Sequence, residues 1–485
     1  MSDSTNKKSF LDHASVLRVI LVLLLAAFAL PLYSQNTEVQ SVEQRLQRLE
    51  QRLTDLEARL ATVKAPSADS TSTDRFDVLD QKLRILERNR ELEQEELVAK
   101  KKEAPVVGAG EDGFFLRSAD KSFQLKLGGH LQADSRSFYD DSIHAGVDSF
   151  VLRRVRPIVS GTIFKFVDFN LVPDFAEGKV VLQDAYLDLR YYPKAILRAG
   201  KFKPPVGLER LQADVDTLFV ERALPTNLVP QRDQGVQFWG EIANVNYAVG
   251  VFNGAADGAM IDNDTNDGKD LAGRIFATPF SKRPGHLLQG LGFGASVTTG
   301  RQEGAVLPTF KSSGQATFFT YANNVAAAGR HLRYSPQAYF YYGPFGVLGE
   351  YVQSNQQVAK GTAAGEIANH AWQVSTSYFL TGEKNGFKHG PPRRNFEGTR
   401  GGIGGWELVA RYADLAIDRD AFASGFADIT KSATSAQTWS VGVNWYLNKY
   451  TKLLFDYDQT HFNRGAIVGN RPTEKALMNR LQLSF

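Results

Sequence analysis

The side chains of this chain that could do chemistry are charged groups spread along alternating segments, and they form no catalytic cluster. The sequence has 485 residues and no Cys, which excludes disulfides, thiolate metal sites and Cys nucleophiles. It contains neither an H-E-x-x-H nor a G-x-S-x-G motif, and its eight His residues are scattered. We therefore predict no catalytic, cofactor or metal site. Rows of fixed Lys, Arg, Asp and Glu charges can instead select among ions by electrostatics.

Basic side chains on the polar faces of these segments are the first candidates for such a role. They are Lys126, Arg136, Arg154, Arg156, Arg190, Arg274, Arg333, Arg411, Lys452 and Arg480. The acidic side chains on the same faces are Asp168, Asp174, Asp184, Asp188, Glu407, Asp456 and Asp458. The two signs are mixed, and the whole chain carries a net charge of only +3. Charge alone therefore gives no indication of nucleic-acid binding.

A second group of charges lies in residues 204–233, "PPVGLERLQADVDTLFVERALPTNLVPQRD". This stretch also carries many apolar residues, such as Leu208, Phe219 and Leu224, which need burial. A loop folded back into a water-filled lumen would bury them on the inner wall and place its charges at a constriction. The alternative is a surface loop that packs on its neighbours. The candidates for the constriction are Glu209, Arg210, Asp214, Asp216, Glu221, Arg222, Arg232 and Asp233.

The elements that would position these groups are β-strands. From residue 113 onward apolar and polar residues alternate with period two, as in "FQLKLGGHLQAD" at 123–134. Most of the segments have roughly 9 to 12 residues, long enough to cross a bilayer when tilted. True charges on the polar faces suit a wet lumen, and aromatic residues gather near the segment ends. A soluble β-sandwich, the alternative, would have shorter strands and an apolar interior. The pattern predicts an all-β transmembrane barrel.

We count about sixteen antiparallel strands, an even number as bacterial outer-membrane barrels require. The predicted ranges are 122–137, 149–163, 165–174, 180–191, 195–203, 234–243, 245–254, 270–279, 290–299, 331–342, 345–357, 369–381, 404–416, 436–447, 450–461 and 475–485. If the first strand runs outward from the periplasm, the external loops are mostly long and most periplasmic turns are short. Residues 382–403 are a long, basic exception on the periplasmic side, and nothing in the pattern accounts for their length.

One acidic stretch, "DNDTNDG" at 262–268, is similar to a calcium-binding loop. In such loops a Gly follows the third acidic position directly, and a bidentate Glu stands at position twelve. Here Gly268 comes one place late, and Gly273 stands where the Glu is expected. We therefore favour an acidic surface loop over a calcium site.

The chain begins with the features of an exported protein. Basic residues precede the apolar run "VILVLLLAAFAL" at 19–30, and small residues follow it. This order predicts a secretory signal peptide over residues 1–34, with cleavage after Ala29 or Ser34. The apolar run is short for a transmembrane helix, so an uncleaved anchor is the less favoured alternative.

Residues 36–64 have the pattern of a coiled coil. Apolar residues recur at alternating intervals of three and four, at Val39, Val42, Leu46, Leu49, Leu53, Leu56, Leu60 and Val63. So narrow a stripe needs partner helices, although its length does not distinguish a dimer from a trimer. A single solvated helix is the alternative. We then predict a linker over 65–75, a second helical segment over 76–99, a linker over 100–112 and the barrel over 113–485.

Several barrel segments resemble a known family. "FVLRRVRPIVSGTIFKFVDFNLVPDF" at 150–175, "DAYLDLRYYPKAILRAGKFKPPVGLERL" at 184–211 and "GWELVARYADL" at 405–415 resemble the phosphate-selective porin O and P family. The resemblance covers residues 113–485. It implies a sixteen-stranded, trimeric porin of the bacterial outer membrane, and relatives of the family also carry a coiled-coil segment before the barrel.

The resemblance leads us to expect passive diffusion of small ions or other hydrophilic solutes through a water-filled lumen. Because acids oppose the basic candidates, we expect a pore that mildly favours anions, phosphate included, or a general pore, rather than strict phosphate selectivity. The solute and the pore radius stay open. A different function is also open, in which the barrel anchors a periplasmic coiled coil that spaces or tethers the outer membrane.

The chain ends in an alternating segment, "RLQLSF", on an aromatic residue. We expect this last strand to pair with the first, because an open sheet edge is not stable in hydrocarbon. Leu481, Leu483 and Phe485 would then face outer-membrane lipid. The family resemblance also implies that Phe485 is read by the barrel-assembly machinery.

Overall fold

The computed structural model describes residues 40–59, 71–110, 113–139, 146–264 and 266–485, so the predicted signal peptide lies outside the described residues. The chain divides into two compact units. One comprises Met1–Gly108 with Leu116–Gln124, and the other comprises Ala109–Phe115 with Leu125–Phe485.

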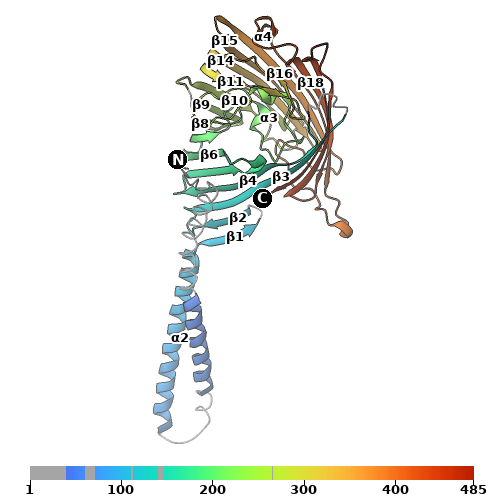
Figure 1. The fold of residues 1–485 in the computed structure, drawn as a ribbon. Coiled ribbons are helices and arrows are strands. Elements are labelled where there is room, and N and C mark those ends of the chain that lie inside the picture. Colours follow the sequence, from blue (N-terminus) through green and yellow to red (C-terminus); the bar gives the residue numbers. More distant parts are fainter. Residues whose placement is uncertain (1–39, 60–70, 111–112, 140–145, 265) are drawn as a thin grey trace, which may run out of the picture. The chain divides into compact units, whose positions relative to one another are not determined.

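The second unit is built on sixteen long antiparallel strands (Figure 1). They are β3 (Gln124–Tyr139), β4 (Ser149–Ile163), β5 (Val167–Asp174), β6 (Val181–Tyr192), β7 (Ala195–Phe202), β8 (Asp233–Ile242), β9 (Val245–Phe252), β10 (Asp270–Ala277), β11 (Gly290–Val306), β14 (Ala326–Tyr342), β15 (Phe345–Lys360), β16 (Ala363–Phe379), β17 (Gly405–Ala416), β18 (Ala433–Tyr446), β19 (Thr451–Arg464) and β20 (Glu474–Ser484). Each strand pairs with its neighbours in chain order.

Pairing of the last strand with the first closes the barrel. The register of β20 against β3 runs from Lys475 opposite Tyr139 to Ser484 opposite His130. Phe485 continues it, because its backbone N–H and C=O both bond to Gly129 at 3.0 Å. The predicted closure is confirmed, and it leaves neither of these two strands with an open edge.

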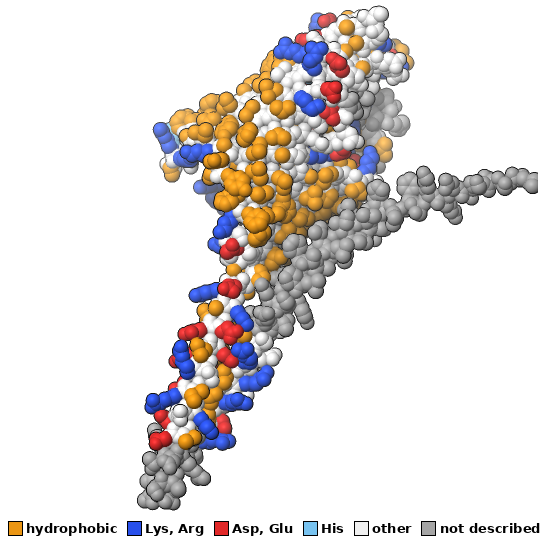
Figure 2. Space-filling view, turned by 90° about the vertical axis from the view of Figure 1, so that its left-hand side faces the viewer, with side chains coloured by type: hydrophobic (Ala, Val, Ile, Leu, Met, Phe, Trp, Pro, Cys, Tyr) orange, Lys and Arg blue, Asp and Glu red, His pale blue; other side chains and the backbone are white. Residues whose placement is uncertain are grey.

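Alternation along the strands gives the barrel an apolar outside and a polar inside. In β19, Lys452, Asp456 and Asp458 are buried on the inner face, whereas Phe455 between them is 41% exposed on the outer face. Successive strand side chains point to opposite faces, so this pattern repeats around the sheet. Figure 2 shows the resulting apolar side chains gathered across the outer face of the strands.

All sixteen predicted strands are present, with differences at their ends. β4 has the predicted bounds, whereas β15 and β16 continue past the predicted loop 358–368 into a tight turn. Gly361 has a φ of 60° there, a conformation that permits a two-residue hairpin turn. The prediction also missed four short strands, β1 (Val106–Gly110), β2 (Gly113–Arg117), β12 (Phe310–Lys311) and β13 (Thr317–Phe319).

The described residues of the first unit form two helices, residues 40–59 and α2 (Thr71–Glu103). Arg45 pairs with Glu93 at 3.1 Å and Glu96 at 3.2 Å, and Glu43 pairs with Lys101 at 2.7 Å, so the helices run antiparallel within one chain. α2 extends beyond the predicted 76–99 into both expected linkers, 65–75 and 100–112. The last turn of α2 contains three lysines, which interact favourably with the C-terminal end of a helix dipole. One of them, Lys100, also pairs with Glu96 at 3.0 Å. Among the described helices, none is long and apolar enough to cross a membrane.

Candidate constriction and pore lining

The connection between β7 and β8, residues 203–232, folds into the barrel and is fixed to the inner wall at two places. It contains the short helices α3 (Leu208–Leu211) and η2 (Leu224–Leu228). At α3, the Glu350 carboxylate of β15 accepts the backbone N–H groups of Leu208 at 2.6 Å and Glu209 at 3.3 Å. Further along, Arg411 of β17 donates to the Glu221 carbonyl at 2.9 Å and lies 4.2 Å from the Phe219 ring centroid.

Apolar side chains hold the same loop to the wall. Val206, Leu224 and Leu228 are almost fully buried in one cluster with inward side chains such as Val352 of β15 and Ala371 of β16. Full burial of one such side chain stabilises by roughly 1.5–3 kcal/mol, which explains why this charged loop also needed so many apolar residues. Those residues are the sequence signal that predicted an inward-folded loop.

A second segment enters the lumen between β16 and β17. In residues 382–403, Phe387 stacks on Tyr339 of β14 and its carbonyl accepts a hydrogen bond from Gln212 at 2.8 Å. The His389 backbone N–H donates to Asp216 at 3.3 Å. This long connection therefore contacts the inward-folded loop directly, which accounts for a length that the sequence pattern left unexplained.

On the other side of the loop lies an open cavity of about 1110 Å³ along β4, β5 and β6. Its charged lining residues are more often basic than acidic. Nine are basic: Arg136, Arg153, Arg154, Arg156, Lys179, Arg210, Arg222, Arg232 and Lys311. Six are acidic: Asp174, Glu177, Asp214, Glu221, Asp257 and Asp264.

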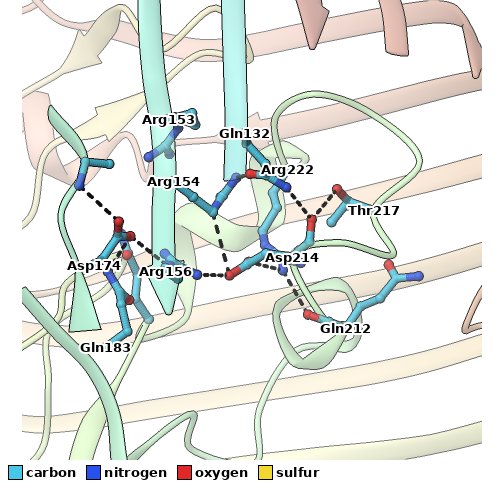
Figure 3. Close-up of polar contacts among 12 residues, drawn as sticks. Gln132, Arg153, Arg154, Arg156, Asp174, Gln183, Gln212, Asp214, Thr217 and Arg222 are labelled. Atoms are coloured by element: carbon cyan, nitrogen blue, oxygen red, sulfur yellow. Dashed lines mark hydrogen bonds and ion pairs between the residues drawn. The ribbon is translucent and has the colours of Figure 1, made fainter. Parts of the chain in front are cut away.

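The charges concentrate around one carboxylate of the loop, Asp214 (Figure 3). It is ion-paired with Arg156, lies 2.7 Å from Arg222, and lies 3.7 Å and 3.8 Å from Arg154 and Arg232. Burial alone would raise the pKa of Asp214, but the surrounding cations lower it well below its usual range. Two of these arginines also bind a second carboxylate, Arg156 that of Asp174 at 2.6 Å and Arg232 that of Asp184 at 3.1 Å. Four guanidinium groups therefore face three carboxylates, which leaves one surplus positive charge.

A second carboxylate of the loop repeats this arrangement. Glu221 lies 2.6 Å from Arg153 and 2.8 Å from Arg136. Arg153 and Arg154 are adjacent in β4, yet both line the cavity, so the strict alternation breaks at this point. Arg153 was not among the basic residues that the sequence analysis predicted to line the lumen.

The predicted constriction residues therefore separate into two groups. Arg210, Asp214, Glu221, Arg222 and Arg232 line the cavity. The other three predicted residues, Glu209, Asp216 and Asp233, do not line it. Glu209 accepts a hydrogen bond from Gln373 of the wall at 3.0 Å, and Asp233 caps the Gly254 and Ala255 N–H groups, both at 2.8 Å.

The ten predicted basic residues of the strands also divide. Arg136, Arg154 and Arg156 line the large cavity, and Arg274 lines a smaller one. Arg333, Arg411, Lys452 and Arg480 are 0–4% exposed and bind protein groups, as when Arg480 pairs with Asp134 at 2.7 Å. Lys126 lies near the start of β3 and Arg190 near the end of β6, where Arg190 pairs with Asp168 at 2.8 Å.

The smaller cavity, about 400 Å³, is lined by residues of β5 to β10 and of the loop. It adjoins the large one at an ion pair, because Arg232 lines the large cavity and Asp184, 3.1 Å away, lines the small one. Its basic residues Arg198 and Lys203 were also missed by the sequence analysis. In the acidic loop 262–268, the Asp262 carboxylate is ion-paired with Lys201 of β7, so it already has a cation of the protein as its partner.

A closed antiparallel barrel with an apolar outer face, a charged interior and an inward-folded loop is the architecture of an outer-membrane diffusion channel. The phosphate-selective porin O and P family matches residues 125–485, and the chain belongs to this family. It is accordingly a passive channel of the bacterial outer membrane, as the sequence predicted.

The sequence identity to individual proteins is low. Porin O of Pseudomonas aeruginosa is 24% identical in an alignment of 417 positions that covers 79% of this chain and 93% of that protein. The outer membrane channel DcaP of Acinetobacter baumannii is 11% identical, with a TM-score of 0.49 over 75% of this chain and 98% of the other. An anion-selective porin from Comamonas acidovorans is 12% identical, with a TM-score of 0.46 over 75% and 100%.

Proposed function

We propose that the channel favours anions and that the arginines around Asp214 and Glu221 set this preference. The observation that carries the proposal is the charge of the large cavity, whose lining holds nine basic and six acidic residues, with the arginines gathered around Asp214 and Glu221. A passing anion is attracted by the surplus positive charge, whereas a cation is repelled. Because both carboxylates remain ionised, the preference is moderate and not limited to phosphate.

The test is the reversal potential of the purified full-length protein in planar bilayers under a KCl gradient. We expect the sign of the reversal potential to show that chloride is more permeant than potassium. Single channels should conduct in both chloride and phosphate solutions. Cation preference would overturn the proposed selectivity. A barrel that inserts without conducting would instead favour the tether function.

We further infer that the protein is a homotrimer with a periplasmic helical segment that forms a coiled coil. Family resemblance supports the trimer. The heptad seam supports the coiled coil, because Val42 and Leu53 are buried within one chain while Leu46, Leu49 and Leu56 keep partly exposed surface for further helices. Light scattering of the detergent-solubilised protein should give three protomer masses, and one protomer mass would contradict the trimer.

We also propose that Phe485 serves barrel assembly. Its ring is 48% exposed and packs edge-to-face on Phe114 with ring centroids 6.1 Å apart, so it remains accessible at the rim of the closing strands. Phe485→Ala should lower the yield of folded barrel in outer membranes, with Phe485→Trp as the conservative control. Equal yields for the wild type and the Ala variant would contradict this role.

A further inference from the structure

The smaller cavity has an aromatic lining that general ion passage does not require. Its lining includes Tyr186 of β6, Phe202 of β7, Trp239 of β8 and Tyr247 of β9. Tyr186 and Phe202 pack edge-to-face with ring centroids 6.0 Å apart. Aromatic surface of this kind offers a flat apolar ligand a large contact area at little entropic cost.

A stacked arginine extends this flat surface. Arg198 of β7 binds the Asp188 carboxylate through two parallel hydrogen bonds of 2.7 Å. Its guanidinium carbon lies 3.8 Å from the Tyr186 ring centroid and 5.2 Å from that of Trp239. The bidentate pair fixes the orientation of the guanidinium plane, and such planes stack on aromatic rings.

Two further cations line the cavity without a carboxylate of their own. Arg274 of β10 donates to the Gln337 side-chain oxygen at 3.2 Å and 3.0 Å, and Lys203 donates to the Gln212 carbonyl at 2.7 Å. Among the described residues, no ion pair within 4 Å joins either cation to an acid, and the only acidic residue of the lining, Asp184, is bound to Arg232. The cavity therefore carries surplus positive charge.

One further polar group in this lining has no partner. The indole N–H of Trp239 is buried and makes no hydrogen bond to any described residue. Burial lowers the pKa of Lys203, and the nearby Asp214 offsets only part of this shift. Both groups would gain from an acceptor anion in the cavity, because an unpaired buried donor costs free energy.

We propose that the smaller cavity is a binding subsite for planar aromatic carboxylates, of which benzoate is the simplest. The ring would lie against Trp239 and the Arg198 plane, and the carboxylate would be bound by Arg274 and Lys203. The proposal rests on the anion preference proposed above and adds a solute class to it. It involves reversible binding during passage and no chemical step.

Other solutes match this lining less well. Inorganic phosphate could bind the cations, but it would leave the aromatic surface in contact with water. A neutral sugar could stack on Trp239, but it would leave the charges of Arg274 and Lys203 uncompensated. Only a solute that is both flat and anionic satisfies the two sets of groups together.

The experiment compares three anions as blockers of the chloride current through single channels of the full-length protein: benzoate, cyclohexanecarboxylate and inorganic phosphate. Benzoate and cyclohexanecarboxylate have the same charge and nearly the same size, but only benzoate is planar and aromatic. We expect benzoate to block at about a fivefold lower concentration than cyclohexanecarboxylate. Equal potency of the two carboxylates would overturn the proposal.

Two variants assign the effect to this cavity. Trp239→Leu should remove the preference for benzoate over cyclohexanecarboxylate, and Trp239→Phe should restore most of it. Arg274→Gln should weaken the block by both carboxylates alike, because it removes charge and not aromatic surface. Trp439→Leu is the matched control, since Trp439 lies on the outer face of β18 and is 37% exposed. A loss of preference in this control, or its persistence in Trp239→Leu, would place the binding elsewhere.

The design separates failure of this proposal from failure of the proposed selectivity. If reversal potentials show anion preference but the two carboxylates block equally, only the aromatic subsite is wrong. If reversal potentials show cation preference, the anion-favouring function is wrong, whichever carboxylate blocks better.

Discussion

The inner wall of the barrel has a filled side and an open side, and the same strand pattern produces both. On the filled side, β15 to β20, the inward-folded loop 203–232 covers the wall, and Arg411 and Lys452 bind its carbonyl groups. On the open side, β4 to β10, the inward residues line cavities, as Arg156 and Arg274 do. Arg156 is itself ion-paired with Asp214 of the loop, but it also borders the open cavity. An arginine that faces inward is therefore structural alone, or also meets solute, according to whether the loop covers it completely.

This difference matters for how the channel is expected to respond to mutation. A covered arginine neutralises a buried carboxylate, so its loss affects folding. A cavity-lining arginine contributes to the potential that a passing ion meets, so its loss affects selectivity. The following variants test this division, from the largest expected effect to the smallest.

The largest effect should come from the filled side. Arg411→Met removes the cation that lies 3.4 Å from Asp458 and the donor to the Glu221 carbonyl. An unpaired buried charge remains, so we expect the free energy of unfolding to fall by about 3–5 kcal/mol. The measurement is denaturant unfolding of the refolded barrel in detergent, followed by Trp fluorescence.

Two comparisons make this result interpretable. Arg330→Met changes an arginine of β14 that is exposed, and it should leave the unfolding free energy nearly unchanged. The double variant Arg411→Met with Asp458→Asn removes both charges and should recover part of the loss. If Arg411→Met is as stable as Arg330→Met, the division into a filled and an open side does not hold.

The next effect should appear on the open side, as two opposite changes in selectivity. Arg156→Gln removes one of the four arginines around Asp214, whereas Asp214→Asn removes the carboxylate itself. The interaction of one fixed charge with a hydrated ion at close range is worth about 1 kcal/mol. Each variant should therefore change the chloride-to-potassium permeability ratio about fivefold. Arg156→Gln should lower the ratio and Asp214→Asn should raise it. Reversal potentials that move in the same direction would contradict the assignment.

The success of sequence reasoning follows the same division. Period-two alternation located all sixteen strands, because each strand buries one face in lipid and the pattern is local to the strand. The apolar residues of 204–233, such as Leu224, likewise indicated an inward fold, because they needed a wall to pack on. These features depend on chemistry within one segment or between one segment and its surroundings.

What could not be predicted depends on contacts between distant segments. Arg411 and Arg156 have the same alternation, and only the path of the loop decides which is covered. Arg153 breaks the alternation of β4, so its inward direction had no sequence signal. The inward fold of 382–403 is visible only through contacts such as Phe387 on Tyr339. Side-chain type and spacing carry no record of such pairings.

A smaller and pH-independent effect is expected at Glu221. Burial alone would raise its pKa, but the guanidinium groups of Arg153 and Arg136 lower it far below the usual range for Glu. A carboxyl with a lowered pKa keeps its charge as the pH falls and loses it only below that pKa. Glu221→Gln should therefore raise the chloride-to-potassium permeability ratio by the same factor at pH 5 as at pH 7. A factor that shrinks at pH 5 would show that Glu221 titrates as an ordinary exposed carboxyl.

The smallest effect should come from removing the helical unit. None of the residues that the structure describes within 36–104 lines either cavity, and every charge assigned to selectivity lies between β3 and β20. Deleting residues 36–104 should therefore leave the single-channel conductance and the reversal potential unchanged. The particle mass from light scattering serves as an internal comparison, because loss of a coiled coil can weaken association without altering the pore. If the deletion variant keeps its association state but its reversal potential changes, charges outside the barrel contribute to ion selection. The contrast between the filled and open sides of the barrel would then not account for all of the selectivity.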